Sequence, residues 1–448
     1  MTADELVKLL TQAFFGRQLF LVGGSLRDQL LGRDSKDLDL ATDAEPQETR
    51  ERVRALADDL WSVGEKFGTI GLNKDGFRAE ITTFRADAYD HVTRKPEVSF
   101  GDDIVEDLAR RDFTINAIAR NLHTGELLDP FGGRDDLKAR LVRFVGDPLI
   151  RIAEDPLRML RAVRFCAQLG FELDPAGAAA IAERADELQR ISWERVRDEL
   201  DGVMFSERPR DGLRLMIDLG LARRVLPELL VLHLPEPGRH HMKDVLEHTL
   251  DTVQFVSAEK LLRYAALLHD ICKPETYCDD DTGAHFYRHE SLGAAKAREI
   301  LARLKQPSAF IDQVAKLVEE HLRVPFYASE WSDSAIRRLM FDLGDQLEAA
   351  MALADADVRA SDPSDYPEFQ QRLRELRARV AQVGEAAEMA RMKPLLDGQE
   401  VMALLGLEPG PRVGEALQFL LDQQIEGKVT TRQEAEEAVR VWFGGRGT

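Results

Sequence analysis

The chain has few cysteines and no long apolar run. Its three cysteines, Cys166, Cys272 and Cys278, lack the paired spacing of zinc ligands, which argues against a disulfide framework and favours a reducing compartment. No apolar stretch approaches the roughly 20 residues that cross a bilayer. The N-terminus lacks a basic segment followed by an apolar one, so it predicts a helix rather than a signal peptide. These absences predict a cytoplasmic protein with no membrane partner.

Positive charge is also scarce, with 60 lysines and arginines against 80 aspartates and glutamates. The resulting net charge of −20 disfavours nonspecific attraction to nucleic acid over the whole surface, and no DNA partner is expected. It leaves room for one basic channel on an acidic body. Internal repeats and low-complexity tracts are absent from the sequence, and 448 residues are enough for several packed units.

Strand and helix patterns alternate in the first part of the chain. Residues 19–23 predict a buried strand, the glycines of "GGS" open a helix that Gly32 ends, and residues 37–41 predict a second strand. Two further strands, "GTIGL" and "RAEITTF", are separated by "NKDG", which favours a hairpin. From Asp147 onward helical periods dominate. The expected fold class is therefore α+β, with an α/β head followed by a mainly helical body and tail.

Linker-like clusters of proline and polar residues divide the helical part. They occur at "PEPGRHH" and around "ASDPSDYPEF". The predicted domains are accordingly residues 1–146, 147–234, 235–365 and 366–448.

Two aspartates of one strand carry the first chemical signal. In "SKDLDLAT", Asp37 and Asp39 project to the same face, because residues i and i+2 of a strand do so at about 7 Å. Like charges this close favour a cation between them, and Mg²⁺ suits hard oxygen ligands and substrate phosphates. Glu80, on a predicted neighbouring strand, is a candidate third ligand.

The preceding "GGSLRD" predicts an anion site. Gly24 lets the backbone approach a phosphate at a helix N-terminus, where free N–H groups and the helix dipole favour negative charge, and Arg27 adds a charged donor. A glycine pair alone is a weak signal, and an isolated D-x-D pair is commonly a solvated surface pattern. The order strand, glycine turn, helix and strand with D-x-D is far more specific, and it predicts a triphosphate cradle.

Five ordered motifs carry a resemblance to a known family. They are "LVGGSLRDQLLGRDSKDLDLAT", "RRDFTINAIA", "LLDPFGGRDDL", "EDPLRMLRAVRFCAQLGF" and "ERVRDEL". In this order they resemble the bacterial class II tRNA nucleotidyltransferases and their poly(A) polymerase relatives. The resemblance implies a DNA polymerase β-like head over residues 1–146, with Asp37 and Asp39 as catalytic metal ligands. It also implies that Arg111, Asp112 and Asn116 surround the ribose and triphosphate.

The motif "EDPLRMLR" is a candidate for base selection. A helix there would place Asp155 and Arg158 on one face, with Arg161 and then Arg164 continuing the row; an isolated pair of this kind is more often an intrahelical ion pair. A carboxylate only accepts hydrogen bonds and a guanidinium only donates, which matches the amino donor and ring-nitrogen acceptor of both cytosine and adenine. Guanine and uracil present the opposite pattern and would be rejected. The resemblance assigns this role to the pair, within residues 147–234.

The segment of residues 86–100 lies where the family has a flexible loop. It is polar, and basic near Arg94 and Lys95. In the family, enzymes that add only CC lack or shorten this loop, so the resemblance implies a product that includes the terminal A.

Histidines and aspartates gather in the third predicted domain. His248 alone would more often be a packed core residue, but the adjacent His269 and Asp270 can ligate a divalent metal. Residues 235–365 resemble an HD phosphohydrolase domain, which implies His248, His269, Asp270 and a later aspartate as ligands, with His289 nearby. Asp355 and Asp357 both remain open for the later ligand, with Asp357 favoured. Cys272 departs from the glycine usual after "HDI".

The tail resembles the C-terminal segment of the HD-containing members of the family. Its "GLEPGPRVG" has the form of a phosphate-binding loop, or equally of a helix–turn–helix packing unit. A helical tail over residues 366–448 would hold the tRNA body by its shape. The predicted function is template-independent addition of CCA to the tRNA 3′ end from CTP and ATP. The alternatives are an A-adding enzyme or poly(A) polymerase, a metal phosphohydrolase, and a noncatalytic RNA-binding remnant.

Overall fold

The computed structural model describes residues 1–34, 37–61, 68–88, 97–233, 244–280, 283–361, 363–384 and 393–444. Its contacts divide the chain into two units, Met1–Val225 and Leu226–Thr448. Each unit is described by itself. The finer division into four domains stays a prediction.

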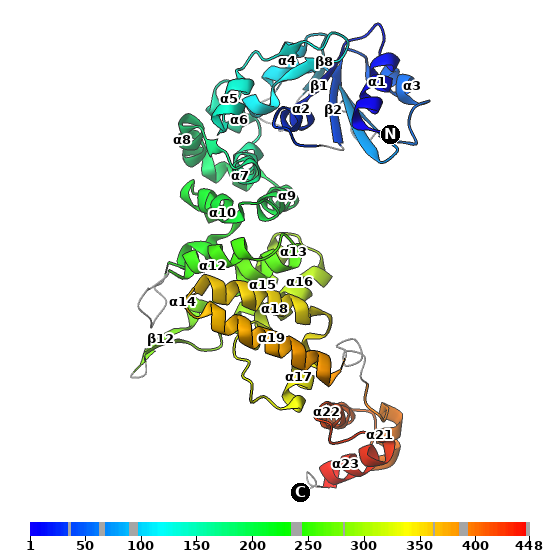
Figure 1. Ribbon diagram of the computed structural model, residues 1–448, viewed down its shortest axis with the longest axis vertical. Helices are drawn as coiled ribbons and strands as arrows, with labels where there is room; N and C mark the ends of the chain where they lie inside the picture. The colour runs from blue at the N-terminus through cyan, green and yellow to red at the C-terminus, as the bar shows by residue number, and fades with distance from the viewer. Residues whose placement is uncertain are drawn as a thin grey trace. The chain divides into compact units, whose positions relative to one another are not determined.

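A seven-stranded mixed sheet forms the centre of the first unit (Figure 1). Its strands, in spatial order, are β3 (Asp59–Trp61), β4 (Thr69–Lys74), β5 (Phe77–Thr83), β2 (Asp37–Thr42), β1 (Leu19–Val22), β8 (Ala119–Asn121) and β9 (Leu127–Leu128). Strands β2 and β5 pair in parallel and the other neighbours pair antiparallel. The predicted hairpin joins β4 and β5, where Asp75 and Gly76 both have positive φ, at 50° and 82°, as a tight type I′ turn requires.

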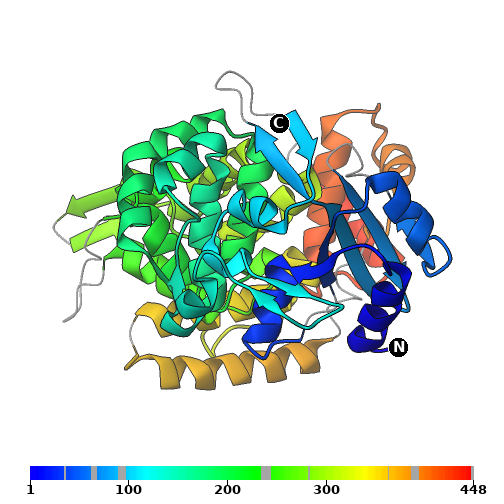
Figure 2. The ribbon, with the colours of Figure 1, turned by 90° about the horizontal axis from the view of Figure 1, so that it is seen from above.

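Short helices cover the sheet and connect its strands. They are α1 (Ala3–Ala13), α2 (Gly23–Leu30), α3 (Pro46–Val53), α4 (Ile104–Ala109), η2 (Thr114–Asn116) and α5 (Gly133–Ala139). Helices α1 and α3 lie side by side near the N-terminus (Figure 2). Phe20, Val22, Ala41 and Phe84 lie at the heart of a buried apolar cluster, so the strands that carry the aspartates are fixed by the core.

The segment predicted to be a flexible loop has a strand at each end. Strands β6 (Arg85–Ala88) and β7 (Glu97–Phe100) pair antiparallel in a sheet of their own. Arg94 and Lys95, on which the prediction depends, lie outside the described residues.

Helices make up most of the remainder of the first unit. After β10 (Leu141–Val142) come α6 (Pro148–Glu154), α7 (Leu157–Leu169), β11 (Glu172–Leu173), α8 (Pro175–Arg184), η3 (Ala185–Arg190), α9 (Trp193–Met204), α10 (Pro209–Asp218) and α11 (Ala222–Val225). Helix α7 packs against α9 and α10. Ten of its thirteen residues are buried, and nine of these are apolar, while Arg158, Arg161 and Arg164 lie on the side that faces the cavity described below.

One predicted helix is broken in two. The sequence predicted a helix through "EDPLRMLR", but α6 ends at Glu154 and Asp155 has extended backbone, with φ −145° and ψ 100°. Pro156 is the reason, because the residue before a proline is driven away from helical backbone. The expectation that one helix carries both Asp155 and Arg158 is therefore wrong.

The second unit is almost entirely helical. Its elements are η4 (Pro227–Val231), α12 (Val245–Phe255), α13 (Lys260–Leu268), α14 (Lys273–Thr276), β12 (Tyr277–Asp280), β13 (Gly283–Phe286), α15 (His289–Arg303), α16 (Ser308–Glu320), α17 (Asp333–Leu343), η5 (Gly344–Gln346), α18 (Leu347–Ser361), α19 (Tyr366–Val383), α21 (Gly398–Leu405), α22 (Pro411–Ile425) and α23 (Arg432–Gly444). The hairpin of β12 and β13 was not predicted. The α+β fold class is confirmed.

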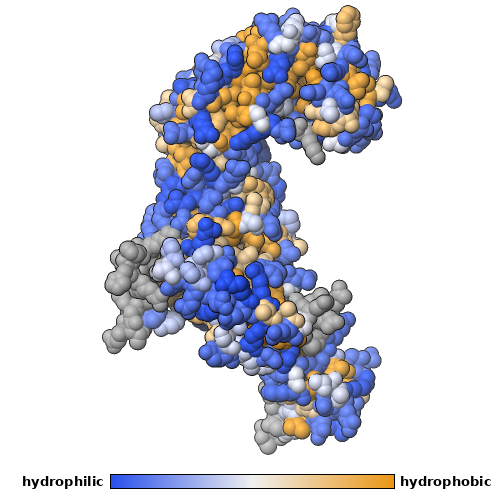
Figure 3. All heavy atoms as spheres, in the orientation of Figure 1, coloured by the Kyte–Doolittle hydropathy of each residue, from blue (hydrophilic) through white to orange (hydrophobic). Residues whose placement is uncertain are grey.

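Hydrophilic residues cover much of the face of each unit that Figure 3 shows, with hydrophobic residues interspersed. None of the described helices is both long and apolar enough to cross a membrane. All three cysteines are free, as expected.

Candidate functional site

A polar cavity of about 530 Å³ opens in the first unit, lined from β1, β2, β5, α2, α7 and α9. Seven arginines and four carboxylates line it, in a chain whose net charge is −20. They are Arg27, Arg110, Arg111, Arg158, Arg161, Arg164, Arg195, Asp39, Glu80, Asp112 and Asp155. This local excess of positive charge suits a polyanionic ligand. The structure brings together here all nine residues that were predicted to bind nucleotide, Gly24 and Asn116 among them.

Asp39 lies at the N-terminus of helix α2. Its Oδ2 accepts hydrogen bonds from the backbone N–H groups of Gly24 (3.1 Å) and Ser25 (3.4 Å). Gly23 turns the chain from β1 into α2 with φ of +64°, and a Cβ there would lie 3.1 Å from Arg111 Nη1 and 3.2 Å from Asp39 Oδ2. Glycine therefore permits the helix end and the carboxylate to approach this closely. The predicted triphosphate cradle and Asp39 share one corner of the cavity.

The predicted Mg²⁺ ligands lie on two neighbouring strands. Asp39 is in register with Glu80 across β2 and β5, and both line the cavity, whereas Asp37 is exposed opposite Arg78. Burial raises the pKa of Asp39, Arg111 opposes this, and the negative charge of Glu80 raises it further. A cation between the carboxylates would offset both the cost of burying their charge and the repulsion between them. An all-oxygen donor set of this kind fits Mg²⁺.

Asp112 is the centre of a buried polar network beside this corner. Its Oδ2 accepts a hydrogen bond from Arg161 Nε (2.7 Å) and its Oδ1 accepts one from Asn116 Nδ2 (3.2 Å). Asn116 Oδ1 in turn accepts one from Arg27 Nη1 (2.9 Å). Burial alone would raise the pKa of Asp112, but Arg161 lowers it to about 2. The network fixes two cavity arginines through one carboxylate.

Asp155 and Arg158 both line the cavity, each held by another partner. Asp155 pairs with Arg195 of α9 at 2.6 Å, and Arg158 pairs with Glu154 at 2.5 Å. Arg158 also donates a hydrogen bond to the carbonyl oxygen of Arg110 (2.9 Å). The intrahelical ion pair between Asp155 and Arg158 is therefore not what the structure contains. Arg195 was missed by sequence reasoning because it comes from a distant helix.

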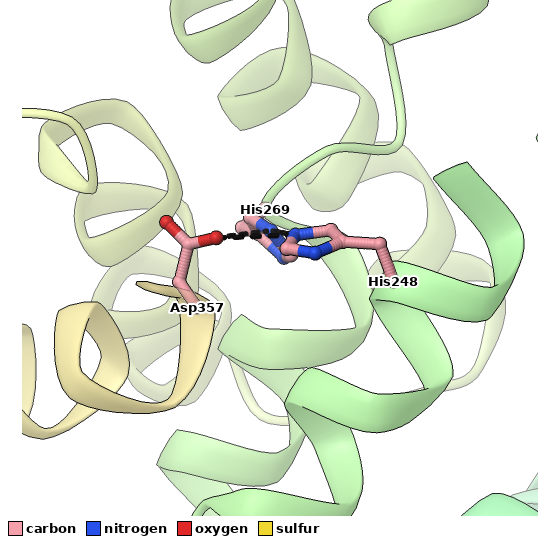
Figure 4. A group of neighbouring side chains, drawn as sticks. All are labelled: His248, His269 and Asp357. Carbon is pink, nitrogen blue, oxygen red and sulfur yellow. Dashed lines mark hydrogen bonds and ion pairs between the residues drawn. The ribbon is translucent and has the colours of Figure 1, made fainter. Parts of the chain in front are cut away.

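A second group of titratable side chains lies in the second unit, between α12, α13 and α18 (Figure 4). His248 Nε2 lies 3.1 Å from His269 Nε2 and 3.1 Å from Asp357 Oδ1. The three ligand atoms lie within 4.8 Å of one another. Asp355 points elsewhere, since its carboxylate accepts a hydrogen bond from Tyr366 Oη. The structure thus places Asp357, rather than Asp355, with the two histidines.

Asp270 joins this group to a second one. Its Oδ2 lies 3.1 Å from His269 Nε2, and its Oδ1 lies 3.5 Å from His289 Nε2 and 3.8 Å from His321 Nε2. Oδ2 is buried and accepts no hydrogen bond from the described residues, although Lys273 Nζ lies 2.8 Å away. His321 was missed, because a lone histidine at the end of a helix gives no local signal. His285 stacks on Tyr287 and is not in either group.

Three of these histidines turn Nε2 toward the centre of the cluster. Nδ1 of His269, His289 and His321 lies 2.8, 2.7 and 2.7 Å from a backbone carbonyl oxygen. A carbonyl oxygen only accepts hydrogen bonds, so Nδ1 carries a proton, and the lone pair of a neutral ring is then on Nε2 and faces inward. The Nε2 atoms of His289 and His321 are only 3.3 Å apart. Facing lone pairs repel, and a cation between them would convert that repulsion into ligation.

Without a bound cation, a proton on His269 would balance the charge of its neighbour Asp270. Burial lowers the pKa of His269, but Asp270 outweighs it and raises the pKa to about 9. Burial lowers the pKa of His321 to about 4. Burial would raise the pKa of Asp357, but His248 and His269 bring it down to about 2. Both carboxylates are thus charged in a buried site, where a divalent cation is the natural counter-ion.

The tail segment folds as a three-helix packing unit. Helices α21, α22 and α23 share an apolar cluster around Val401, Leu420 and Val439. Gly410 precedes α22 in extended backbone, with φ of 176°. The phosphate-binding reading of this loop stays a prediction.

Family models match three parts of the chain. The poly(A) polymerase head domain matches residues 19–143, and a model described as an RNA and SrmB-binding site of polymerase A matches residues 170–232. A model for domain 2 of tRNA nucleotidyltransferases matches residues 284–439.

Named relatives match the chain over nearly its whole length. An A-adding tRNA nucleotidyltransferase of Deinococcus radiodurans is 37% identical (94% of this chain, 95% of that protein), and a CC-adding enzyme of Thermus thermophilus is 34% identical (96% and 95%). A CCA-adding enzyme of Geobacillus thermodenitrificans is 31% identical (94% and 91%). The Bacillus stearothermophilus CCA-adding enzyme, solved with CTP, superposes with a TM-score of 0.71 at 26% identity (100% and 99%). The chain therefore belongs to the family of bacterial CCA-adding enzymes and their A-adding and CC-adding relatives, and it is a nucleotidyltransferase.

Proposed function

We propose that the chain adds C, C and A in turn to the 3′ end of tRNA, using CTP and ATP and no template. The observation that carries this proposal is the arginine-rich cavity around Asp39, in which the predicted nucleotide-binding residues meet. In the proposed reaction the RNA 3′-hydroxyl attacks the α-phosphate in line and pyrophosphate leaves. The relatives named for A, CC and CCA addition support the reaction class.

Different residues of the cavity have different roles in the proposed reaction. Asp37 and Asp39, with Glu80, would hold Mg²⁺, which when bound supplies positive charge to the attacking and leaving oxygens. Arg27 and Arg111 would bind the triphosphate by charge-assisted hydrogen bonds. Since these arginines are already fixed by their partners, little reorganisation is needed when the nucleotide enters.

Base selection is proposed for Asp155 and Arg158. Asp155 accepts from the amino group that cytosine and adenine share, and Arg158 donates to the neighbouring ring nitrogen. Arg195 and Glu154, their observed partners, would orient the two side chains. Guanine and uracil would place a carbonyl acceptor against the Asp155 carboxylate and an N–H donor against the Arg158 guanidinium. The helices after residue 146, with the tail of residues 366–448, are proposed to hold the tRNA body in the cytoplasm, where the tRNA pool is.

Extension of defined transcripts tests this proposal. With Mg²⁺, CTP and ATP, the protein should extend a tRNA that lacks its 3′ end by CCA, and Asp39→Ala should abolish extension while the far-UV circular dichroism is unchanged. Asp59→Ala is a matched control, because Asp59 is an exposed aspartate of the same sheet outside the cavity lining. Extension only of transcripts that already end in CC would make the chain an A-adding enzyme. Unlimited A tails would make it a poly(A) polymerase.

The histidine cluster favours a second function. We propose that His248, His269 and Asp357 hold one divalent cation and that His289 and His321 hold another, with Asp270 between them. Cations bound there would polarise a phosphate ester and activate water, which is phosphohydrolase chemistry. The inward-facing Nε2 atoms support this proposal independently of the head.

Metal content and phosphate release test the second function together. The purified full chain should retain divalent metal after dialysis, and His321→Ala should lower that content. The wild type should open 2′,3′-cyclic phosphate ends of RNA to a phosphomonoester or release phosphate from 2′-phosphate ends, and His269→Ala should do neither. His285→Ala is the control, since this histidine lies outside both ligand groups. A metal-free wild type, or equal metal in wild type and His321→Ala, would contradict the proposal.

A further inference from the structure

Phe165 contacts three arginines of the cavity at once. Its ring, on helix α7, is only 5% exposed. The guanidinium carbons of Arg27, Arg161 and Arg164 lie 5.1, 5.6 and 4.6 Å from the ring centroid.

Each of these guanidiniums also has a hydrogen-bond acceptor. Arg27 donates to Asn116 (2.9 Å), Arg161 to Asp112 (2.7 Å) and Arg164 to Glu199 (2.6 Å). Arg161 Nη1 also lies 3.8 Å from Glu199, and Asn116 donates a hydrogen bond to Asp112, so these acceptors link the arginines in pairs. The Phe165 ring contacts all three.

Three like charges around one point repel, and the chemistry of the ring counters this. The face of an aromatic ring is electron-rich and attracts a cation, which an aliphatic side chain of similar volume cannot do. The Phe113 ring lies nearly perpendicular to it, at 83°, with the ring centroids 5.5 Å apart. The ring can therefore keep the arginines gathered before any anion is bound.

We propose that Phe165 is a positioning residue for the nucleotide, acting through the electrostatic attraction of its ring for Arg27, Arg161 and Arg164. This rests on the proposed function, because the three arginines are taken to bind the nucleotide. Gathered guanidiniums bind a polyanion with less reorganisation than free ones. The ring contributes through its electron density, not only through its volume.

Fluorinated phenylalanines separate these two contributions. Each added fluorine withdraws electron density from the ring with little change in shape. Equilibrium binding of CTP and ATP to the full chain, measured by calorimetry, should weaken progressively with fluorination at position 165, by roughly tenfold overall. The thermal midpoint should stay unchanged, which a purely structural role would not predict alongside weaker binding.

Phe144 provides the matched control. It is a buried phenylalanine of the same unit whose ring packs on Phe113 at 4.9 Å, away from the three arginines. The same fluorinated series at Phe144 should leave nucleotide binding constant. Constant binding along the series at Phe165, or no binding of either nucleotide to the wild type, overturns the inference. Extension assays run in parallel report on the proposed function separately: an active enzyme with a flat series refutes the role of Phe165 alone.

Discussion

The buried carboxylate of Asp112 should stabilise the first unit by a measurable amount, and Asp112→Asn should remove this stabilisation. The asparagine keeps the shape and the hydrogen bond from the backbone of Phe113 but loses the charge that faces Arg161. The pKa of Asp112 falls from its ordinary 3.8 to about 2 on folding. This difference corresponds to about 2 kcal/mol of unfolding free energy.

The sign of the pH dependence follows from the lowered pKa. Because the folded chain binds the Asp112 proton more weakly, the contribution is fully present above about pH 4 and is lost as the pH falls toward 2. The loss caused by Asp112→Asn should therefore be constant between pH 5 and 8, by this linkage. Urea unfolding followed by hydrogen exchange of the α7 amides measures it locally, apart from the second unit.

A surface aspartate of the same unit provides the control. Asp135 pairs with Lys138 at 2.9 Å, but both side chains are mostly exposed, so Asp135→Asn should leave the unfolding free energy unchanged. An Asp112→Asn variant as stable as the wild type would contradict this role of Asp112. A loss of stability that grows between pH 5 and 8 would also contradict it, because a group other than Asp112 would then cause the pH dependence.

Two further predictions concern the core of the head and the histidine cluster. Gly71→Ala should lower the unfolding free energy by about 1–3 kcal/mol, and with it the thermal midpoint, because the Cβ of the alanine would lie 2.1 Å from the Trp61 ring. An unchanged midpoint would mean that the ring moves freely. Asp357→Asn should lower the metal content of the purified chain, whereas Asp355→Asn, which alters contacts with Tyr366 and Gln370, should not; equal metal in the two variants would contradict the ligand assignment.

The elements that sequence reasoning placed well are specified by local chemistry. The strand with Asp37 and Asp39, the glycine turn before α2 and the hairpin at Asp75 and Gly76 each depend on residues next to one another. Such signals survive folding because tertiary contacts reinforce them.

The features that sequence reasoning missed arise from contacts across the chain. Arg195 lines the cavity from α9 and Glu199 of the same helix pairs with Arg164, and nothing near them in sequence indicates their partners. His321 joins the cluster from the end of α16. The break at Pro156 is different, because its signal was local and the helical periodicity on both sides obscured it.

Addition of C, C and A in turn is tested most directly with three transcripts of one tRNA, which end before the first C, after the first C and after the second C. With Mg²⁺, CTP and ATP, we expect all three transcripts to reach the same CCA end and to grow no further. We also expect that GTP and UTP are not incorporated. Failure to extend any of them, or extension of the last transcript alone, would contradict it.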